Sequence, residues 1–132
     1  MTTYVLDTSA YSIMGRNRSG VVHQLVQTAE HIWIPSIVLG ELLYGFVNGN
    51  RETNNRRNLQ RFMSLSRTAV ASVDSDSAER YAIIYQYLRK QGTPIPINDI
   101  WIAAITMQYG ATLLTADAHF QNIPHILARN LT

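Results

Sequence analysis

Four of the nine acidic residues stand where regular structure is expected to begin or end. Asp7 directly follows the apolar segment 3–6, and Asp117 lies just beyond the apolar segment 112–115. Asp99 begins a long apolar stretch, and Glu41 lies among apolar residues at helical spacing. A carboxylate on an apolar helix face is half-buried, which is unfavourable unless the charge has a partner. The spacing therefore favours one shared acidic site.

Carboxylates that meet in one pocket repel one another, so they cannot all stay ionised without a cation. Oxygen ligands without histidine or cysteine suit Mg²⁺ or Mn²⁺ better than zinc. Such an ion makes a water molecule acidic enough to attack a phosphodiester. The acids are therefore predicted both as metal ligands and as catalytic residues of a metal-dependent phosphodiester hydrolase: Asp7, Glu41, Asp99 and Asp117.

Two of the four acids also have a simpler structural interpretation. Asp99 alone is typical of the first turn of a helix, behind Asn98 as the expected N-cap. Asp7 alone suits an N-cap of the helix that follows it. Four independent caps at the ends of alternating elements are a poorer explanation than one pocket, and the functional interpretation is preferred.

The elements that must position these acids alternate between strand and helix. Apolar patterns predict strands at residues 3–6, 31–34, 69–73 and 112–115, with a possible edge strand at 126–128. Helices are expected from Thr8 to a polar loop at 15–20, then at 21–29, 37–47 (capped by Ser36), 52–66, 76–91 and 99–109. The pattern predicts an α/β fold, a three-layer sandwich with a central, mostly parallel sheet of four to five short strands and helices on both faces. Such sheets bind ligands beyond the carboxyl ends of their strands, where the acids lie.

Composition is typical of a single globular domain spanning residues 1–132, with 46% apolar and 15% charged residues. The absence of cysteine excludes disulfides and thiolate metal sites. The opening residues lack a basic segment followed by a long apolar core, so no secretory signal is expected. No apolar run approaches the roughly 20 residues of a membrane helix, and a cytoplasmic protein is the expectation.

Four sequence motifs carry a resemblance to a known family. They are VLDTS at 5–9, SIVLGEL at 36–42, NDIWIAA at 98–104 and LTADAHF at 114–120 followed by Ile123-Pro124. In this order and spacing the chain closely resembles PIN-domain ribonucleases, and among them the VapC-type toxins of toxin–antitoxin pairs. The resemblance covers essentially the whole chain.

The resemblance implies an endoribonuclease that leaves 5′-phosphate and 3′-hydroxyl ends, with Asp7, Glu41, Asp99 and Asp117 around Mg²⁺ or Mn²⁺. Hydroxyls that orient water or a carboxylate are implied at Thr8 or Ser9 and at Thr115, and Asn98 is included as a supporting polar residue. Many relatives carry another acid where this chain has His119, which leaves the number of metal ions open. We expect His119 as a polar residue at the pocket rim, with direct ligation as the alternative.

Partners are also implied by the resemblance: an RNA substrate, a cognate antitoxin that covers the active site, and a homodimer or a toxin–antitoxin hetero-oligomer. Candidate phosphate contacts are Arg16 and Arg18, in the expected loop near Asp7, and Arg57 and Arg61, one turn apart on the polar helix. A solvated helix face is the alternative for the latter pair.

Other functions lack the residues they need. An aspartyl phosphatase is expected to carry a second aspartate at position 9, which is Ser9, and a receiver domain needs a lysine at a strand end. No glycine-rich phosphate loop follows the first strand. Two alternatives stay open: a catalytically weak RNA- or antitoxin-binding module of the same fold, and a DNA-directed metal nuclease.

Overall fold

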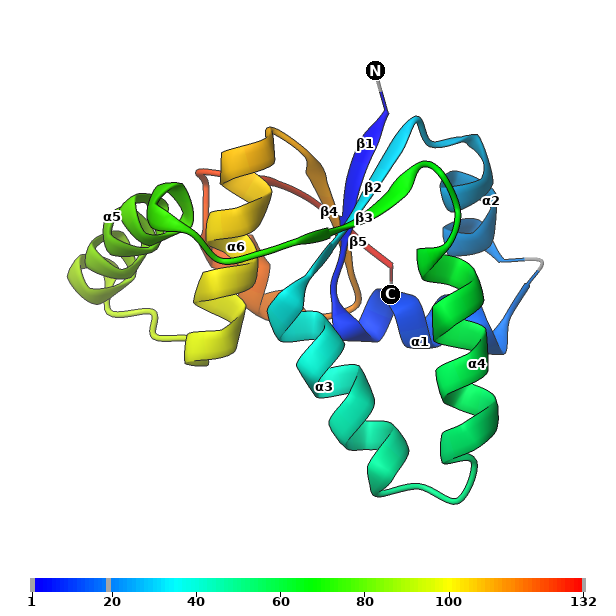
Figure 1. Cartoon of the computed structure of the whole chain (residues 1–132). Coiled ribbons are helices and arrows are strands. Elements are labelled where there is room, and N and C mark those ends of the chain that lie inside the picture. The colour runs from blue at the N-terminus through cyan, green and yellow to red at the C-terminus, as the bar shows by residue number, and fades with distance from the viewer. Residues whose placement is uncertain (1, 19, 132) are drawn as a thin grey trace.

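Five short strands form the centre of the computed structural model, which describes residues 2–18 and 20–131 (Figure 1). They are β1 (Thr3–Leu6), β2 (His31–Pro35), β3 (Thr68–Ala71), β4 (Thr112–Thr115) and β5 (Leu127–Asn130). Their order across the sheet is β3-β2-β1-β4-β5, and every neighbouring pair is parallel. The α/β class predicted from the sequence is confirmed, and the C-terminal segment does add an edge strand.

Helices cover both faces of this sheet. They are α1 (Thr8–Arg16), α2 (Val21–Thr28), α3 (Ser36–Val47), α4 (Glu52–Met63), α5 (Ser75–Gln91), α6 (Ile97–Tyr109) and the short 3₁₀ helix η1 (Ala118–Asn122). In Figure 1 the sheet is seen nearly edge-on, with α5 and α6 on one side and α1, α2 and α4 on the other. Right-handed crossovers explain this division, because the chain moves outward from β1 to β3 and then returns in the opposite direction to β4 and β5.

The reversal of direction gives the sheet a topological switch point between β1 and β4. The two strands pair in parallel, with Leu6 opposite Leu114. Their carboxyl ends therefore open onto the same crevice, which is where parallel sheets of this kind bind ligands. Asp7 follows β1 directly, and Ala116 and Asp117 follow β4.

The core beneath this crevice is built from the strand interiors and from α6. Val5, Leu6, Leu113 and Leu114 are fully buried, as expected for central parallel strands. Helix α6 is buried on most sides, and Gly110 ends it with φ 59°, a left-handed conformation that favours glycine. The helix that carries Asp99 is thus fixed by packing along its length and by a glycine cap at its end.

Several boundaries differ from the sequence-based expectation. Asn98 is not the N-cap of α6, because Pro96 takes that position and the helix starts at Ile97. Ser36 is likewise the first residue of α3 behind Pro35 as the cap. A proline offers no side-chain acceptor, but its fixed φ suits a cap, here −57° and −56° for the two residues.

The remaining differences are shifts of a few residues. Helix α1 continues through Gly15 to Arg16, α4 ends at Met63, β3 spans Thr68–Ala71, and β5 spans Leu127–Asn130. Among the described residues, no helix is both long and apolar enough to cross a bilayer.

Candidate active site

Asp7 lies at the bottom of the crevice, directly after β1. It is 5% exposed and caps α1, accepting hydrogen bonds from the Ala10 backbone N–H (2.8 Å) and the Ser9 hydroxyl (2.7 Å). A short third hydrogen bond comes from the Thr115 hydroxyl. Burial raises the pKa of the Asp7 carboxyl, and these three hydrogen bonds offset part of that rise. Burial therefore disfavours the ionised form of Asp7, and a bound cation would stabilise it.

The segment after β4 is tied to the segment after β1 by the same hydroxyls. Thr115, only 1% exposed, donates to Asp7 and accepts from the Asp117 backbone N–H at 2.9 Å. Ser9 accepts from the Ala116 backbone N–H at 2.9 Å. The carboxylates of Asp7 and Asp117 are therefore held at one end of the β1–β4 pair.

Asp99 approaches this pair from the first turn of α6. Burial raises its pKa, a hydrogen bond to His119 lowers it, and the negative charges of Asp117 and Glu41 raise it further. Asp99 is therefore close enough to Asp117 and Glu41 for their charges to act on it, although the three acids come from different elements.

Glu41 completes the acidic group from α3. Its Oε1 accepts a 2.6 Å hydrogen bond from the Thr8 hydroxyl, and Asn98 Nδ2 lies 3.5 Å from its Oε2. Glu41 is partly buried, as expected for an acid on an apolar face. It lies between the first residues of α1 and those of α6, facing the same crevice.

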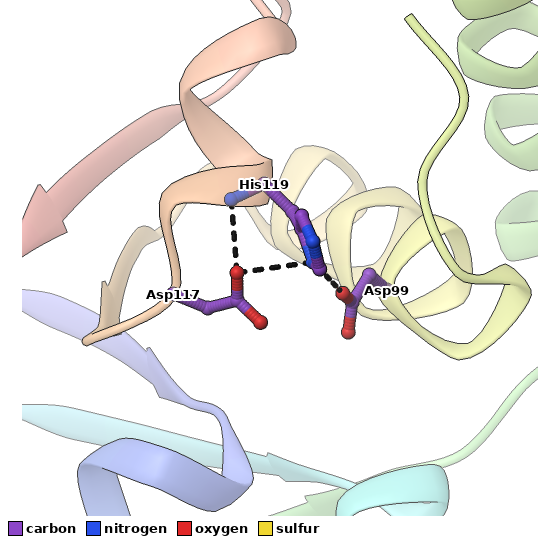
Figure 2. A group of neighbouring side chains, drawn as sticks. All are labelled: Asp99, Asp117 and His119. Atoms are coloured by element: carbon purple, nitrogen blue, oxygen red, sulfur yellow. Dashed lines mark hydrogen bonds and ion pairs between the residues drawn. The ribbon is translucent and has the colours of Figure 1, made fainter.

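His119 is in direct contact with two of the acids (Figure 2). Its Nδ1 lies 2.9 Å from Asp99 Oδ2 and 3.0 Å from Asp117 Oδ1, and its backbone N–H donates to Asp117 Oδ1 at 2.9 Å. The hydrogen bond to Asp99 and the charges of both acids raise the pKa of the imidazole, while desolvation lowers it. The histidine therefore balances part of the negative charge of the pocket.

The structure brings together the four acids that the sequence predicts as a site, with Asp99 and Asp117 beside His119 and with Asp7 more deeply buried. One ligand atom each from Asp99, Asp117 and His119 lie within 4.8 Å of one another, a spacing compatible with a shared metal ion. Asp7 lies below this group, linked to it through Thr115, and Glu41 flanks it beside Thr8 and Asn98. The donors are carboxylate oxygens and one imidazole, and the buried acids have raised pKa values, so the site fits a divalent cation.

The four arginines suggested for RNA contacts lie elsewhere. Arg16 is in the last turn of α1 and not in a loop, roughly 13 Å from Asp7 along the helix axis. Arg18 and Arg61 line a cavity of about 410 Å³ between α1, α2 and α4. Arg57 and Arg61 are exposed on α4, where Arg61 donates to Asn58 at 2.8 Å. Within residues 2–18 and 20–131, none of the four forms a hydrogen bond or an ion pair with the acids, and their role in RNA binding stays a prediction.

Two parts of the site were not visible in the sequence. The hydrogen bond between Thr8 and Glu41 joins residues 33 positions apart. The backbone N–H groups of Ala116 and Asp117 also donate hydrogen bonds in the site, and residue types alone do not predict backbone contacts. The hydroxyl residues next to Asp7 and Asp117 were the available signal, because a hydroxyl beside a metal-binding acid commonly orients it.

Comparisons with known proteins point to one family. The PIN domain model matches residues 4–126. Ribonuclease VapC4 of Mycobacterium tuberculosis is 30% identical over 99 residues, covering 74% of this chain and 76% of the relative. Ribonuclease VapC2 of Rickettsia felis is 30% identical over 132 residues, covering 96% of each.

Solved structures are similar over nearly the full length. VapBC2 from Rickettsia felis, bound to a DNA fragment from its promoter, superposes with a TM-score of 0.85 at 26% identity, covering 99% of this chain and 100% of the other. DNA-bound VapBC from Salmonella typhimurium gives a TM-score of 0.84 at 26% identity, covering 98% of each chain.

Proposed function

The chain belongs to the PIN domain family, and on that premise we propose that it is a metal-dependent endoribonuclease acting as the toxin of a toxin–antitoxin pair. The observation that carries the proposal is the meeting of Asp7, Asp99 and Asp117 with Glu41 at the switch point of the sheet. Two relatives are named ribonucleases. Their alignments with this chain span 76% and 96% of the relatives and 74% and 96% of this chain. We propose that residues 1–132 form one nuclease domain.

We assign the metal to Asp99 and Asp117, with Asp7 and Glu41 completing the carboxylate set, and Mg²⁺ or Mn²⁺ as the ion. When bound, a divalent ion supplies Lewis-acid polarisation of the scissile phosphate and lowers the pKa of a water molecule. Hydrolysis then adds water across the P–O3′ bond, which leaves a 5′-phosphate and a 3′-hydroxyl.

The residues around the acids would keep them in place during this reaction. Thr115 holds Asp7 and the backbone at Asp117, and Thr8 holds Glu41. Because these groups are fixed before substrate arrives, little reorganisation is needed when charge develops on the phosphate.

The partners follow from the same proposal. The similar solved structures include VapBC complexes from two organisms. We therefore propose a cognate antitoxin that covers the acidic crevice, in a hetero-oligomer with this chain, and a cytoplasmic location beside the RNA substrate.

The direct test incubates the purified chain with a structured RNA in Mg²⁺ or Mn²⁺, in EDTA, and as Asp99→Asn. Asp76→Asn, at an exposed acid in the first turn of α5, is the matched control. Cleavage is expected only with metal, with 5′-phosphate ends, for the unmodified protein and the control, and at least 100-fold slower for Asp99→Asn. Cleavage that survives EDTA would overturn the proposal.

Two further arms separate the alternatives. RNA that is retained but never cut would indicate a binding module, and faster cutting of a DNA of the same sequence would indicate a DNA-directed nuclease. Induced expression with and without a co-expressed antitoxin tests the toxin role, since growth arrest should disappear when the antitoxin is present.

A further inference from the structure

We propose that His119 is a direct ligand of the metal ion and that its imidazole shifts the preference of the site from Mg²⁺ toward Mn²⁺ and later first-row ions. The inference rests on the proposed metal-dependent function and deepens it by identifying the ion that this particular chain selects.

The positions of the donor atoms carry the inference. A single atom, Nδ1 of His119, lies 2.9 Å from an oxygen of Asp99 and 3.0 Å from an oxygen of Asp117. Two ligands about 2.1 Å from one ion and at right angles to each other are about 3.0 Å apart. The nitrogen and the two oxygens therefore already have the spacing of neighbouring ligands, and all three atoms lie within 4.8 Å of one another.

The local backbone fixes the histidine in this position. Asp117 caps η1, and its Oδ1 accepts the His119 backbone N–H at 2.9 Å, so that the turn from 117 to 119 carries both side chains toward α6 (Figure 2). The His119 side chain is 46% exposed, so an ion can reach it from solvent without opening the fold. The ring is thus oriented by the backbone and accessible at the same time.

The ligand types then determine the ion. Carboxylates and water suit Mg²⁺ and Mn²⁺, whereas imidazole binds well to first-row transition ions and poorly to Mg²⁺. An aspartate at position 119 would add a negative charge that favours a hard ion, and a neutral imidazole does not. A mixed set of carboxylates and one imidazole should consequently bind Mn²⁺, Co²⁺ and Ni²⁺ in rising order of affinity, with Mg²⁺ weakest.

Mn²⁺ itself is the probe for a test that needs no RNA. The full chain is loaded with Mn²⁺, and electron spin echo envelope modulation is recorded with natural nitrogen and with ¹⁵N-histidine. We expect ¹⁴N modulation that changes to the ¹⁵N frequency on labelling, which identifies a histidine ligand in the unmodified protein. His119→Gln should remove the modulation, and His31→Gln, at an exposed histidine in β2, should retain it.

Affinity provides the second measurement. The ratio of Mn²⁺ to Mg²⁺ binding constants, measured by titration calorimetry, should fall about tenfold or more in His119→Asp. Mn²⁺ bound without histidine modulation, or a ratio unchanged in His119→Asp, overturns the inference.

The outcomes also separate this inference from the proposed function. Histidine modulation without RNA cleavage would support His119 as a metal ligand and contradict the proposed nuclease function. Metal-dependent cleavage without histidine modulation would support the nuclease function and contradict His119 as a ligand. Failure to bind Mn²⁺ at all would overturn both hypotheses.

Discussion

The hydroxyl of Thr8 donates a 2.6 Å hydrogen bond to Oε1 of Glu41, which lies 33 residues further along the chain. The bond joins the first residue of α1 to the middle of α3, and it fixes the direction of the Glu41 carboxylate at the edge of the acidic site. Residues that hold a metal-binding acid in this way commonly contribute 10- to 100-fold to metal affinity.

Replacing this hydroxyl should therefore weaken metal binding without touching a ligand. Thr8→Val is expected to lower Mn²⁺ affinity by about tenfold or more, and Thr8→Ser, which keeps the hydroxyl, should remain close to the unmodified protein. Titration calorimetry with Mn²⁺ measures both. Equal affinities for the valine and serine variants would contradict a positioning role for Thr8.

Thr115 should have a larger effect on stability, because its hydroxyl serves two buried groups. Thr115→Val has nearly the same shape but leaves an Asp7 oxygen and the Asp117 backbone N–H without this partner. We expect a loss of about 1–3 kcal/mol in the free energy of unfolding, measured in urea. Thr115→Ser loses only a methyl group and is the control. A valine variant as stable as the serine variant would show that the hydroxyl is not needed.

The stability of the metal-free protein should fall as the pH rises. The pKa values of Asp7 and Asp99 are raised, mainly by burial, and that of His119 is raised mainly by its hydrogen bond to Asp99. In all three cases the folded state binds protons that the unfolded state has released, so stability decreases as pH rises through the raised values.

The measurement is the melting temperature in EDTA between about pH 6 and 8.5, a range that begins just below the ordinary histidine pKa of about 6.5. The His119 contribution is fully present below that value and is lost above it, so His119→Gln should flatten the slope in this range. Added Mn²⁺ should raise the melting temperature more at the alkaline end, because binding requires deprotonated ligands. Parallel slopes for the two proteins would exclude a contribution from His119.

Two glycines should respond in opposite directions to the same substitution. Gly110 has φ 59°, and an added Cβ would meet no atom within 4 Å, so Gly110→Ala loses about 1 kcal/mol through backbone strain alone. Gly45 lies inside α3, also with no atom within 4 Å of an added Cβ, and Gly45→Ala should gain about 0.5–1 kcal/mol. Urea unfolding checks both, and a shift of the same sign for the pair would contradict the assigned backbone conformations.

The arginines of α4 make a separate prediction about RNA affinity. If Arg57 and Arg61 contact phosphates, the double variant Arg57→Gln, Arg61→Gln should reduce the salt dependence of binding by about 0.7 per lost contact. A second double variant on α5, Arg80→Gln with Arg89→Gln, removes the same number of positive charges and is the control. RNA affinity measured at several salt concentrations in Ca²⁺ gives the slopes. A slope equal to that of the control would mean that these arginines are only a solvated face.

The sequence was sufficient to predict the element types, because central parallel strands are continuous apolar runs and helices show a different period. It predicted less well where helices start. Asn98 and Ser36 are predicted as caps, but the caps are Pro96, two residues before Asn98, and Pro35, directly before Ser36, whose backbones already have the conformation that a cap requires. At the start of α5 the cap is Asp74, whose side chain accepts from Ser77.

In the site, too, local sequence patterns predict some features, whereas features that depend on tertiary packing cannot be predicted. The acids could be predicted because each stands at a recognisable end of an element. Their partners could not, since the contacts of Thr8 with Glu41 and of His119 with Asp99 depend on how α1, α3 and α6 pack together. The sequence-based prediction ends the first helix at Gly15 and so places Arg16 in a loop, but a helix tolerates a glycine and α1 continues to Arg16.

The pairing of β1 with β4 has a consequence during protein synthesis. Asp7 is made well before its partner, because the Thr115 that binds it lies 108 residues further along the chain. A nascent chain that has not reached β4 contains Asp7, Glu41 and Asp99 but lacks Thr115, Asp117 and η1, which complete the site. Any premature stop before residue 117 should therefore yield a product without the complete acidic site.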